Sequence, residues 1–149
     1  MERNLKTDVL VVLSITITVF HLLSVSLPYW YKYEKGSEGL WRICTEEECH
    51  EYEYVSAAFR GFLSMEVLGL ISATAVSILL ILKFYTNVEI VHLQIGLVCL
   101  CLFTGFAILT GIFIYGTNEL TMYACYILSS ISASTFFLAA GYCTNAEEG

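Results

Sequence analysis

The stretch Trp30–Arg60, WYKYEKGSEGLWRICTEEECHEYEYVSAAFR, is the only long polar segment of this chain. It contains both tryptophans, four of the seven Lys/Arg residues and seven of the fourteen Asp/Glu residues. The sequence on either side is apolar enough to lie in lipid. We therefore predict that Trp30–Arg60 is an extracellular cap on a four-helix membrane bundle, and that this cap carries the specificity of the protein.

The composition outside the polar stretch is typical of a membrane protein. Of the 149 residues, 57% are hydrophobic, and the mean hydropathy is +0.70, whereas a soluble domain is about 45–50% apolar. The excess falls into four apolar blocks, each of about 20 residues, which is the length that crosses about 30 Å of hydrocarbon. The net charge of −7 lies mainly in the loop and the tail. It argues against nucleic-acid binding and against a polybasic membrane anchor.

Four membrane-spanning helices are predicted in a single domain covering residues 1–149. Asp8 can accept free N–H groups at the start of the first helix, and Pro28 ends that helix because proline cannot continue the hydrogen-bond ladder. No secretory signal peptide is evident, so the first helix is expected to be retained. The predicted helices cover about 8–27, 57–82, 90–115 and 121–142, in up-down-up-down order, with extracellular loops at about 28–56 and 116–120.

Within the polar stretch the pattern changes from helical to extended, since aromatic and β-branched residues partly alternate with charges. Short strands are expected at Trp30–Tyr33, Leu40–Ile43 and Tyr52–Val55. Gly36–Gly39 is a turn signal between the first two strands. Thr45–Glu48 would be the turn of a hairpin whose arms carry Cys44 and Cys49. A disulfide there would close a loop of four residues, contribute about 2 kcal/mol and fix the strand register.

The basic residues give conflicting information about orientation. The predicted cytosolic segments contain Arg3, Lys6 and Lys83, and the predicted outer segment contains Lys32, Lys35, Arg42 and Arg60. The positive-inside rule therefore mildly favours the opposite topology. Paired cysteines in a polar loop, however, fit an oxidising compartment. We give the cysteines more weight and predict an extracellular loop.

The polar stretch also contains a spaced motif. Trp30 follows the first helix, Gly39-Leu40-Trp41 is followed after two residues by Cys44, and Cys49 and then Arg60 complete the series. With these residues and four helices, the chain resembles the claudin, peripheral myelin protein and epithelial membrane protein superfamily over its whole length. The resemblance implies four transmembrane helices with cytosolic termini, a small antiparallel extracellular β-sheet and a Cys44–Cys49 disulfide.

The chain departs from this family pattern in four respects. The gap between the two cysteines is short, and the second outer loop is too short for the paired-loop adhesion of a typical claudin. The last residues, Ala146–Gly149, lack the tyrosine–valine signal that binds junction scaffolds, and no Asn-x-Ser/Thr sequon occurs. These departures indicate a divergent, minimal member and argue against a strand-forming tight-junction role.

The loop residues have competing interpretations. We expect Gly39-Leu40-Trp41 to seat the sheet on the helix ends, with Leu40 and Trp41 buried there, rather than to bind a ligand. The acidic series could face a pore and attract cations, with Glu51 and Glu53 on one face of a strand. The alternative, which we favour, is a solvated hairpin tip. This acidic series consists of Glu46, Glu47, Glu48, Glu51 and Glu53.

Two polar residues are expected inside the membrane at similar depth, His21 in the first helix and Glu66 in the second. We predict a hydrogen-bonded pair that locks the two helices together, and a proton or ion pathway is the sharper alternative. Gly69, Ala73 and Ser77 recur every four residues, a pattern typical of close helix contact. Contact within the bundle is favoured over contact between protomers.

Cys143 lies next to the membrane and is a candidate for S-acylation. The alternative for Cys143, as for Cys99 and Cys101, is a small apolar residue. The sequence contains no Walker A loop, zinc-ligand pair, nucleophile elbow or Cys-x-x-Cys. We therefore predict no enzyme activity, no cofactor and no metal.

The function expected from these features is that of a non-enzymatic tetraspan protein of the plasma membrane. It would act through lateral and cell–cell interactions, in adhesion, junction organisation or membrane organisation. The alternative is a cation-favouring paracellular channel, or an auxiliary subunit of an ion channel. The expected partners are membrane lipids and either itself or other tetraspan proteins in cis or in trans, without nucleic acid or a C-terminal scaffold.

Overall fold

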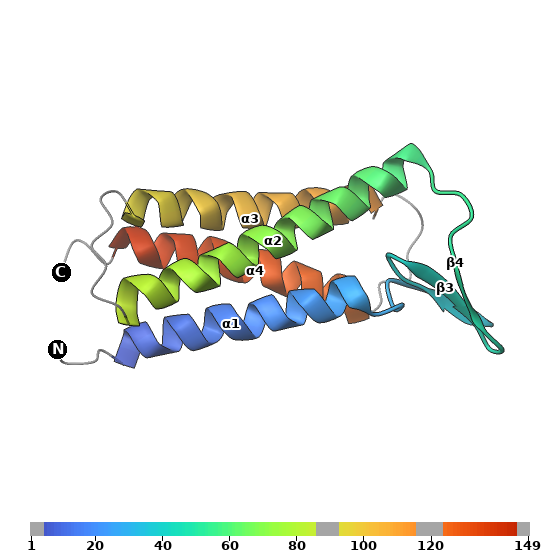
Figure 1. The fold of residues 1–149 in the computed structure, drawn as a ribbon, viewed down its shortest axis with the longest axis horizontal. Coiled ribbons are helices and arrows are strands. Elements are labelled where there is room, and N and C mark those ends of the chain that lie inside the picture. Colours follow the sequence, from blue (N-terminus) through green and yellow to red (C-terminus); the bar gives the residue numbers. More distant parts are fainter. Residues whose placement is uncertain (1–4, 86–92, 116–123, 146–149) are drawn as a thin grey trace.

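A computed structural model describes residues 5–85, 93–115 and 124–145. Its helices form an antiparallel bundle (Figure 1) in which α1 contacts α2 and α4, and α3 contacts the same two helices. Tyr85 at the end of α2 donates a hydrogen bond to Asp8 near the start of α1, and Gln94 near the start of α3 donates to the Cys143 carbonyl near the end of α4. The helices are α1 (Leu5–Ser26), α2 (Ala57–Tyr85), α3 (Leu93–Tyr115) and α4 (Ala124–Asn145).

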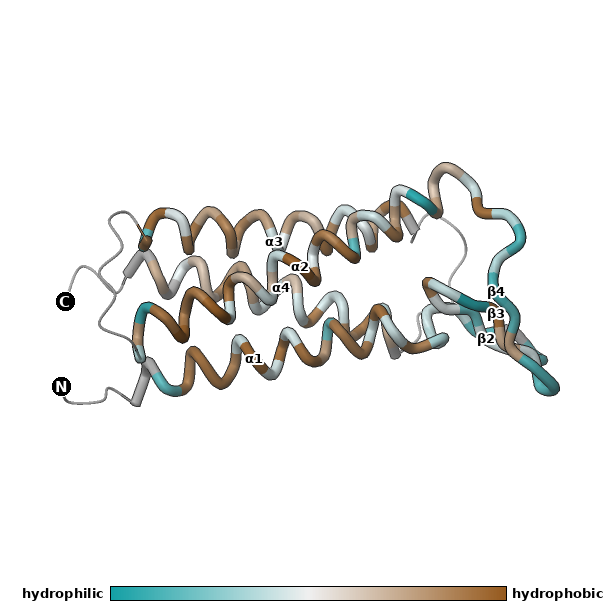
Figure 2. Tube along the Cα trace, in the orientation of Figure 1, coloured by the Kyte–Doolittle hydropathy of each residue, from teal (hydrophilic) through white to brown (hydrophobic). Residues whose placement is uncertain are grey.

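The bundle is apolar and the sheet beyond its end is polar (Figure 2). Among the described residues, three helical segments are long and apolar enough to cross a membrane: Asp8–Ser26, Ala57–Tyr85 and Leu93–Ile114. The apolar part of α4, Cys125–Gly141, is shorter. Large apolar side chains also cover the outside of the bundle, where 62% of Phe106 and 78% of Phe113 is exposed. Such a surface is stable in lipid and not in water, so the chain is a membrane protein.

Four short strands form an antiparallel sheet beyond the end of α1 (Figure 1). They pair in chain order, and Cys44 lies opposite Cys49 in the last pair. A disulfide joins these two residues, with a Cα–Cα distance of 4.0 Å. The predicted disulfide and the predicted turn between its cysteines are therefore confirmed. The strands are β1 (Tyr31–Tyr33), β2 (Gly36–Glu38), β3 (Arg42–Thr45) and β4 (Cys49–Glu51).

Three predictions within the cap were wrong, and the first concerns β3, which covers Arg42–Thr45 and not the expected Leu40–Ile43. Gly36–Glu38 is a strand rather than part of a turn, because Gly36 packs against β3. A Cβ on Gly36 would collide with the Cys44 carbonyl. The missing side chain of this glycine therefore allows β2 and β3 to lie close together. The segment Tyr52–Val55 is not a strand, because β4 ends at Glu51.

The helix bounds differ from the predicted ones by a few residues. α1 begins at Leu5, so Asp8 lies in its first turn instead of capping it, and it ends at Ser26, two residues before Pro28. α2 and α4 each continue three residues further than expected, to Tyr85 and Asn145. The expected helical residues 90–92 and 121–123 and the second loop at 116–120 lie outside the described residues.

Candidate functional site

The sheet is attached to the bundle by two buried side chains of the motif. Trp30 is 2% exposed and Leu40 is 1% exposed. The Trp30 indole Nε1 donates to the Ser24 carbonyl in the last turn of α1 at 2.6 Å. Its ring meets Phe62 of α2 edge to face, with ring centroids 4.9 Å apart. The junction is therefore an apolar core of its own, in which one hydrogen bond satisfies the indole.

Gly39 and Trp41 flank Leu40 and touch the end of α1. A Cβ on Gly39 would lie 2.5 Å from Pro28 Cα and 2.9 Å from the Leu27 carbonyl oxygen, so only glycine fits. Trp41 donates from Nε1 to the Val25 carbonyl at 2.8 Å, yet 48% of the residue is exposed. The prediction that Trp41 is buried against the helix ends was therefore wrong. Its hydrogen bond to the end of α1 leaves about half of the residue exposed.

A second connection joins the sheet to the beginning of α2. The Tyr52 hydroxyl lies 2.6 Å from the Gly39 carbonyl and 2.9 Å from Glu38 Oε1. Its ring packs on Phe59, at a centroid distance of 4.9 Å. Arg60, the last residue of the motif, is exposed at the start of α2 and takes no place in this apolar core. The role of Tyr52, which joins the sheet to α2, was not predicted, because its local sequence pattern indicated only a strand.

The acidic series is solvent-exposed. All five of its glutamates are exposed, and the Glu48 carboxylate lies 3.2 Å from His50 Nε2. Glu53 follows the end of β4, so the expectation that Glu51 and Glu53 share one face of a strand was wrong. In the described part of the chain, no group of three His, Cys, Asp or Glu residues could hold a metal ion. This arrangement matches a solvated tip.

His21 and Glu66 lie side by side as predicted, but the hydrogen bond between them involves the Glu66 backbone carbonyl and not its carboxylate. Both are 0% exposed, and His21 Nε2 lies 3.8 Å from Glu66 Oε2. The same nitrogen lies 3.2 Å from the Glu66 backbone carbonyl, to which a protonated Nε2 donates. The pair therefore links α1 and α2 within the apolar bundle, where polar contacts between helices stabilise their packing.

Two further helices complete this buried polar cluster. The Ser129 hydroxyl of α4 donates to Glu66 Oε2 at 2.9 Å. Among the described residues, Glu66 Oε1 is the buried side-chain oxygen without a hydrogen-bond partner. A Cβ on Gly111 of α3 would lie 2.8 Å from this oxygen, so the missing side chain leaves room for the carboxylate. The sequence analysis did not predict that Ser129 and Gly111 contact Glu66. The available signal was a serine and a glycine within apolar helices.

The small-residue stripe faces the interior of the chain. Gly69, Ala73 and Ser77 are all buried. A Cβ on Gly69 would lie 2.6 Å from Ile108 Cγ1 of α3 and 3.2 Å from His21 Nε2 of α1. The Ser77 hydroxyl lies 2.9 Å from that of Ser14. The interpretation of contact within the bundle is confirmed.

The cysteines near the other end of the bundle differ in exposure. Cys143 is 3% exposed, Cys101 is fully buried, and Cys99 is exposed. The buried Cys143 fits the alternative of a small apolar residue. Its S-acylation stays a prediction that would require the end of α4 to open.

No protein-family model matches the chain, and a comparison with curated proteins finds no match.

Proposed function

We propose that this chain is a non-enzymatic, four-span protein of the plasma membrane that acts through lateral and cell–cell interactions. The observation that supports this proposal is the fixed attachment of a disulfide-closed sheet to a membrane bundle through Trp30 and Leu40. A sheet held in this way presents its outer residues in one arrangement. It therefore loses little conformational freedom when it binds a neighbouring molecule.

We further propose membership of the claudin, peripheral myelin protein and epithelial membrane protein superfamily. The support is that Trp30, Gly39, Leu40 and Trp41 act together at one junction, and that Cys44 and Cys49 close the adjoining hairpin. The four-span topology with cytosolic termini is part of the same proposal. Its support is the antiparallel packing of α4 against α1 and α3, both of which are apolar enough to span the membrane.

The proposal is tested in a barrier-poor epithelial layer that mixes cells expressing a labelled form of the protein with cells that do not express it. We expect enrichment at contacts between expressing cells and none at contacts with non-expressing cells. Charge reversal at the exposed tip, Glu46→Lys with Glu47→Lys, should reduce this enrichment without reducing surface delivery. Glu53→Lys, which is exposed but lies outside the sheet, is the matched control. Equal enrichment at both kinds of contact would contradict the proposal.

The channel alternative predicts a different result in the same layers. The exposed carboxylates of the acidic series would then raise cation conductance between cells, and Glu51→Gln would abolish the increase. Unchanged conductance together with retained contact enrichment supports the adhesive role. Conductance that is sensitive to Glu51→Gln, without contact enrichment, would replace it with the channel.

A further inference from the structure

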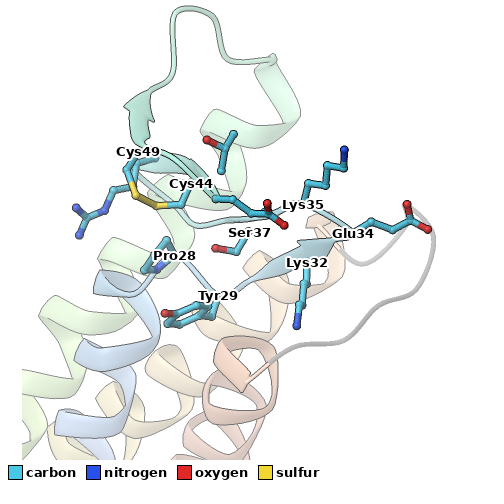
Figure 3. A pocket seen from close by; sticks show the side chains of 12 residues that line it. Pro28, Tyr29, Lys32, Glu34, Lys35, Ser37, Cys44 and Cys49 are labelled. Atoms are coloured by element: carbon cyan, nitrogen blue, oxygen red, sulfur yellow. A yellow bond between two sulfur atoms is a disulfide. The ribbon is translucent and has the colours of Figure 1, made fainter.

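Tyr54 is the most exposed of the large hydrophobic side chains in the described part of the chain, at 84%. It belongs to the loop 52–56, which connects the end of β4 at Glu51 to the start of α2 at Ala57. Figure 3 shows that the chain, after the strand that carries Cys49, rises in a loop away from the helices before it enters α2. The phenol of Tyr54 is therefore accessible to another protein while the chain stays folded.

This loop stands clear of the hydrocarbon core of the membrane. His21 and Glu66 lie at a similar depth, since His21 Nε2 is 3.8 Å from Glu66 Oε2. α1 continues five residues beyond His21, to Ser26, whereas α2 begins nine residues before Glu66, at Ala57. At about 1.5 Å per residue, α2 begins about 6 Å further out than α1 ends. The loop that precedes α2 therefore lies in water rather than among the lipid chains.

The sequence around Tyr54 is strongly acidic. Five glutamates occur in residues 46–53, and no lysine or arginine occurs in residues 43–59. Glu51 and Glu53, three residues and one residue before Tyr54, are both exposed. An enzyme that modifies this tyrosine must therefore present a basic substrate site, because opposite charges steer an encounter and like charges oppose it.

The structure distinguishes Tyr54 from Tyr52, which the sequence does not. Tyr52 has a glutamate on each side and stands in the same acidic segment. Its hydroxyl, however, lies 2.6 Å from the Gly39 carbonyl, and its ring packs on Phe59. Modification of Tyr52 would break the connection between the sheet and α2, whereas Tyr54 takes no part in that connection.

We propose that Tyr54 is a site of tyrosine O-sulfation, introduced by a sulfotransferase of the secretory pathway. The phenolic oxygen attacks the sulfur of a nucleotide phosphosulfate, and an O–S bond forms while the bond from sulfur to the phosphate oxygen of the donor breaks. The phenolic proton passes to a base of the enzyme, and nothing is oxidised or reduced. Sulfate is favoured over phosphate because the Cys44–Cys49 disulfide fits an oxidising compartment, away from cytosolic kinases. The inference rests on the extracellular orientation of the cap, which is part of the proposed function.

The test is metabolic labelling with radioactive sulfate in cells that express the full chain. The label is counted per molecule recovered from the cell surface, so a variant that is retained inside the cell is not scored as unmodified. The wild type should carry sulfate on tyrosine. Tyr54→Phe, which removes only the hydroxyl of an exposed side chain, should lose the label, and Tyr52→Phe should keep it. Label that is lost from Tyr52→Phe and kept by Tyr54→Phe would overturn the assignment.

Variants of the acidic segment test how Tyr54 is recognised. Glu51→Gln with Glu53→Gln should lower the label by about two- to twenty-five-fold, since each exposed charge pair contributes about a factor of 1.4 to 5. Glu46→Gln with Glu47→Gln removes as much charge further from the tyrosine and should lower the label less. An undiminished label after Glu51→Gln with Glu53→Gln would overturn recognition of Tyr54 through its acidic neighbours.

An epitope inserted in the hairpin turn separates failure of this inference from failure of the proposed orientation. An unlabelled wild type whose epitope binds antibody on intact cells would overturn sulfation and leave the orientation standing. An unlabelled wild type whose epitope binds antibody only after permeabilisation would overturn both. A phosphate on Tyr54 that a tyrosine phosphatase removes would also overturn sulfation, because it would assign the loop to the cytosol.

Discussion

Replacing Gly39 by alanine tests the attachment of the sheet directly. The new Cβ would lie 2.5 Å from Pro28 Cα and 2.9 Å from the Leu27 carbonyl oxygen, whereas carbon atoms in contact lie about 3.5–4.0 Å apart. Both obstacles are backbone atoms, so relief requires the sheet to move by about 1 Å. Overpacking of this kind costs about 1–3 kcal/mol.

The same movement would stretch the indole hydrogen bonds from Trp30 to Ser24 and from Trp41 to Val25, which measure 2.6 Å and 2.8 Å. Each bond contributes about 1 kcal/mol. We therefore expect Gly39→Ala to lower the free energy of unfolding by about 3–5 kcal/mol in total.

Equilibrium unfolding in detergent micelles, followed by tryptophan fluorescence, measures this loss. Trp30 and Trp41 are the only tryptophans of the chain, so the signal comes from the junction itself. The matched control is Gly96→Ala in α3, where a Cβ meets nothing within 4 Å. This substitution should stabilise the helix by about 0.5–1 kcal/mol. A Gly39→Ala protein as stable as the wild type would refute the close approach of Gly39 to Pro28.

Further changes should affect stability in a graded way. Glu66→Ala removes the acceptor of Ser129 and leaves a cavity, so it should lower the free energy of unfolding by about 2 kcal/mol or more. Glu66→Gln should lower it less, because glutamine keeps the shape of the side chain and one acceptor oxygen. Similar midpoints for the two variants in detergent unfolding would count against the buried cluster. Trp30→Phe loses one buried hydrogen bond and should cost about 1–2 kcal/mol in chemical unfolding followed by circular dichroism; an unchanged midpoint would contradict its anchoring role. Replacing both Cys44 and Cys49 by serine should cost about 2 kcal/mol by the same measurement, and no loss would show that the disulfide adds nothing to stability.

The predictions that succeeded depended on local sequence. Pro28 cannot continue the hydrogen-bond ladder of α1, and the turn between Cys44 and Cys49 is short, so the two strands that it connects are neighbours along the chain. Gly36 shows the limit of this reasoning. A glycine near a second glycine usually indicates a turn. Gly36 instead allows β2 to approach the Cys44 carbonyl on β3. That requirement comes from a strand further along the chain.

The sequence allowed us to predict the depth of His21 and Glu66 in the bundle, but not which residues of the other helices face them. Counting about 1.5 Å per residue along two antiparallel helices places His21 and Glu66 at a similar depth. Which residues of the other helices face them depends on how each helix is rotated about its axis, and that is set by packing over the whole bundle. Ser129 and Gly111 therefore emerged only from the structure, where they meet the two oxygens of the Glu66 carboxylate.

The central claim, that the sheet caps the outer end of a membrane-inserted bundle, is tested most directly by antibody binding to an epitope in the hairpin turn. The tip between Glu46 and Glu47 is exposed and lies between β3 and β4, so an insertion there spares both strands. On intact cells we predict that this epitope binds antibody, and that the same epitope after Gly149 binds only once the cells are permeabilised. A tip epitope that binds only after permeabilisation would contradict the claim and favour the opposite topology indicated by the basic residues.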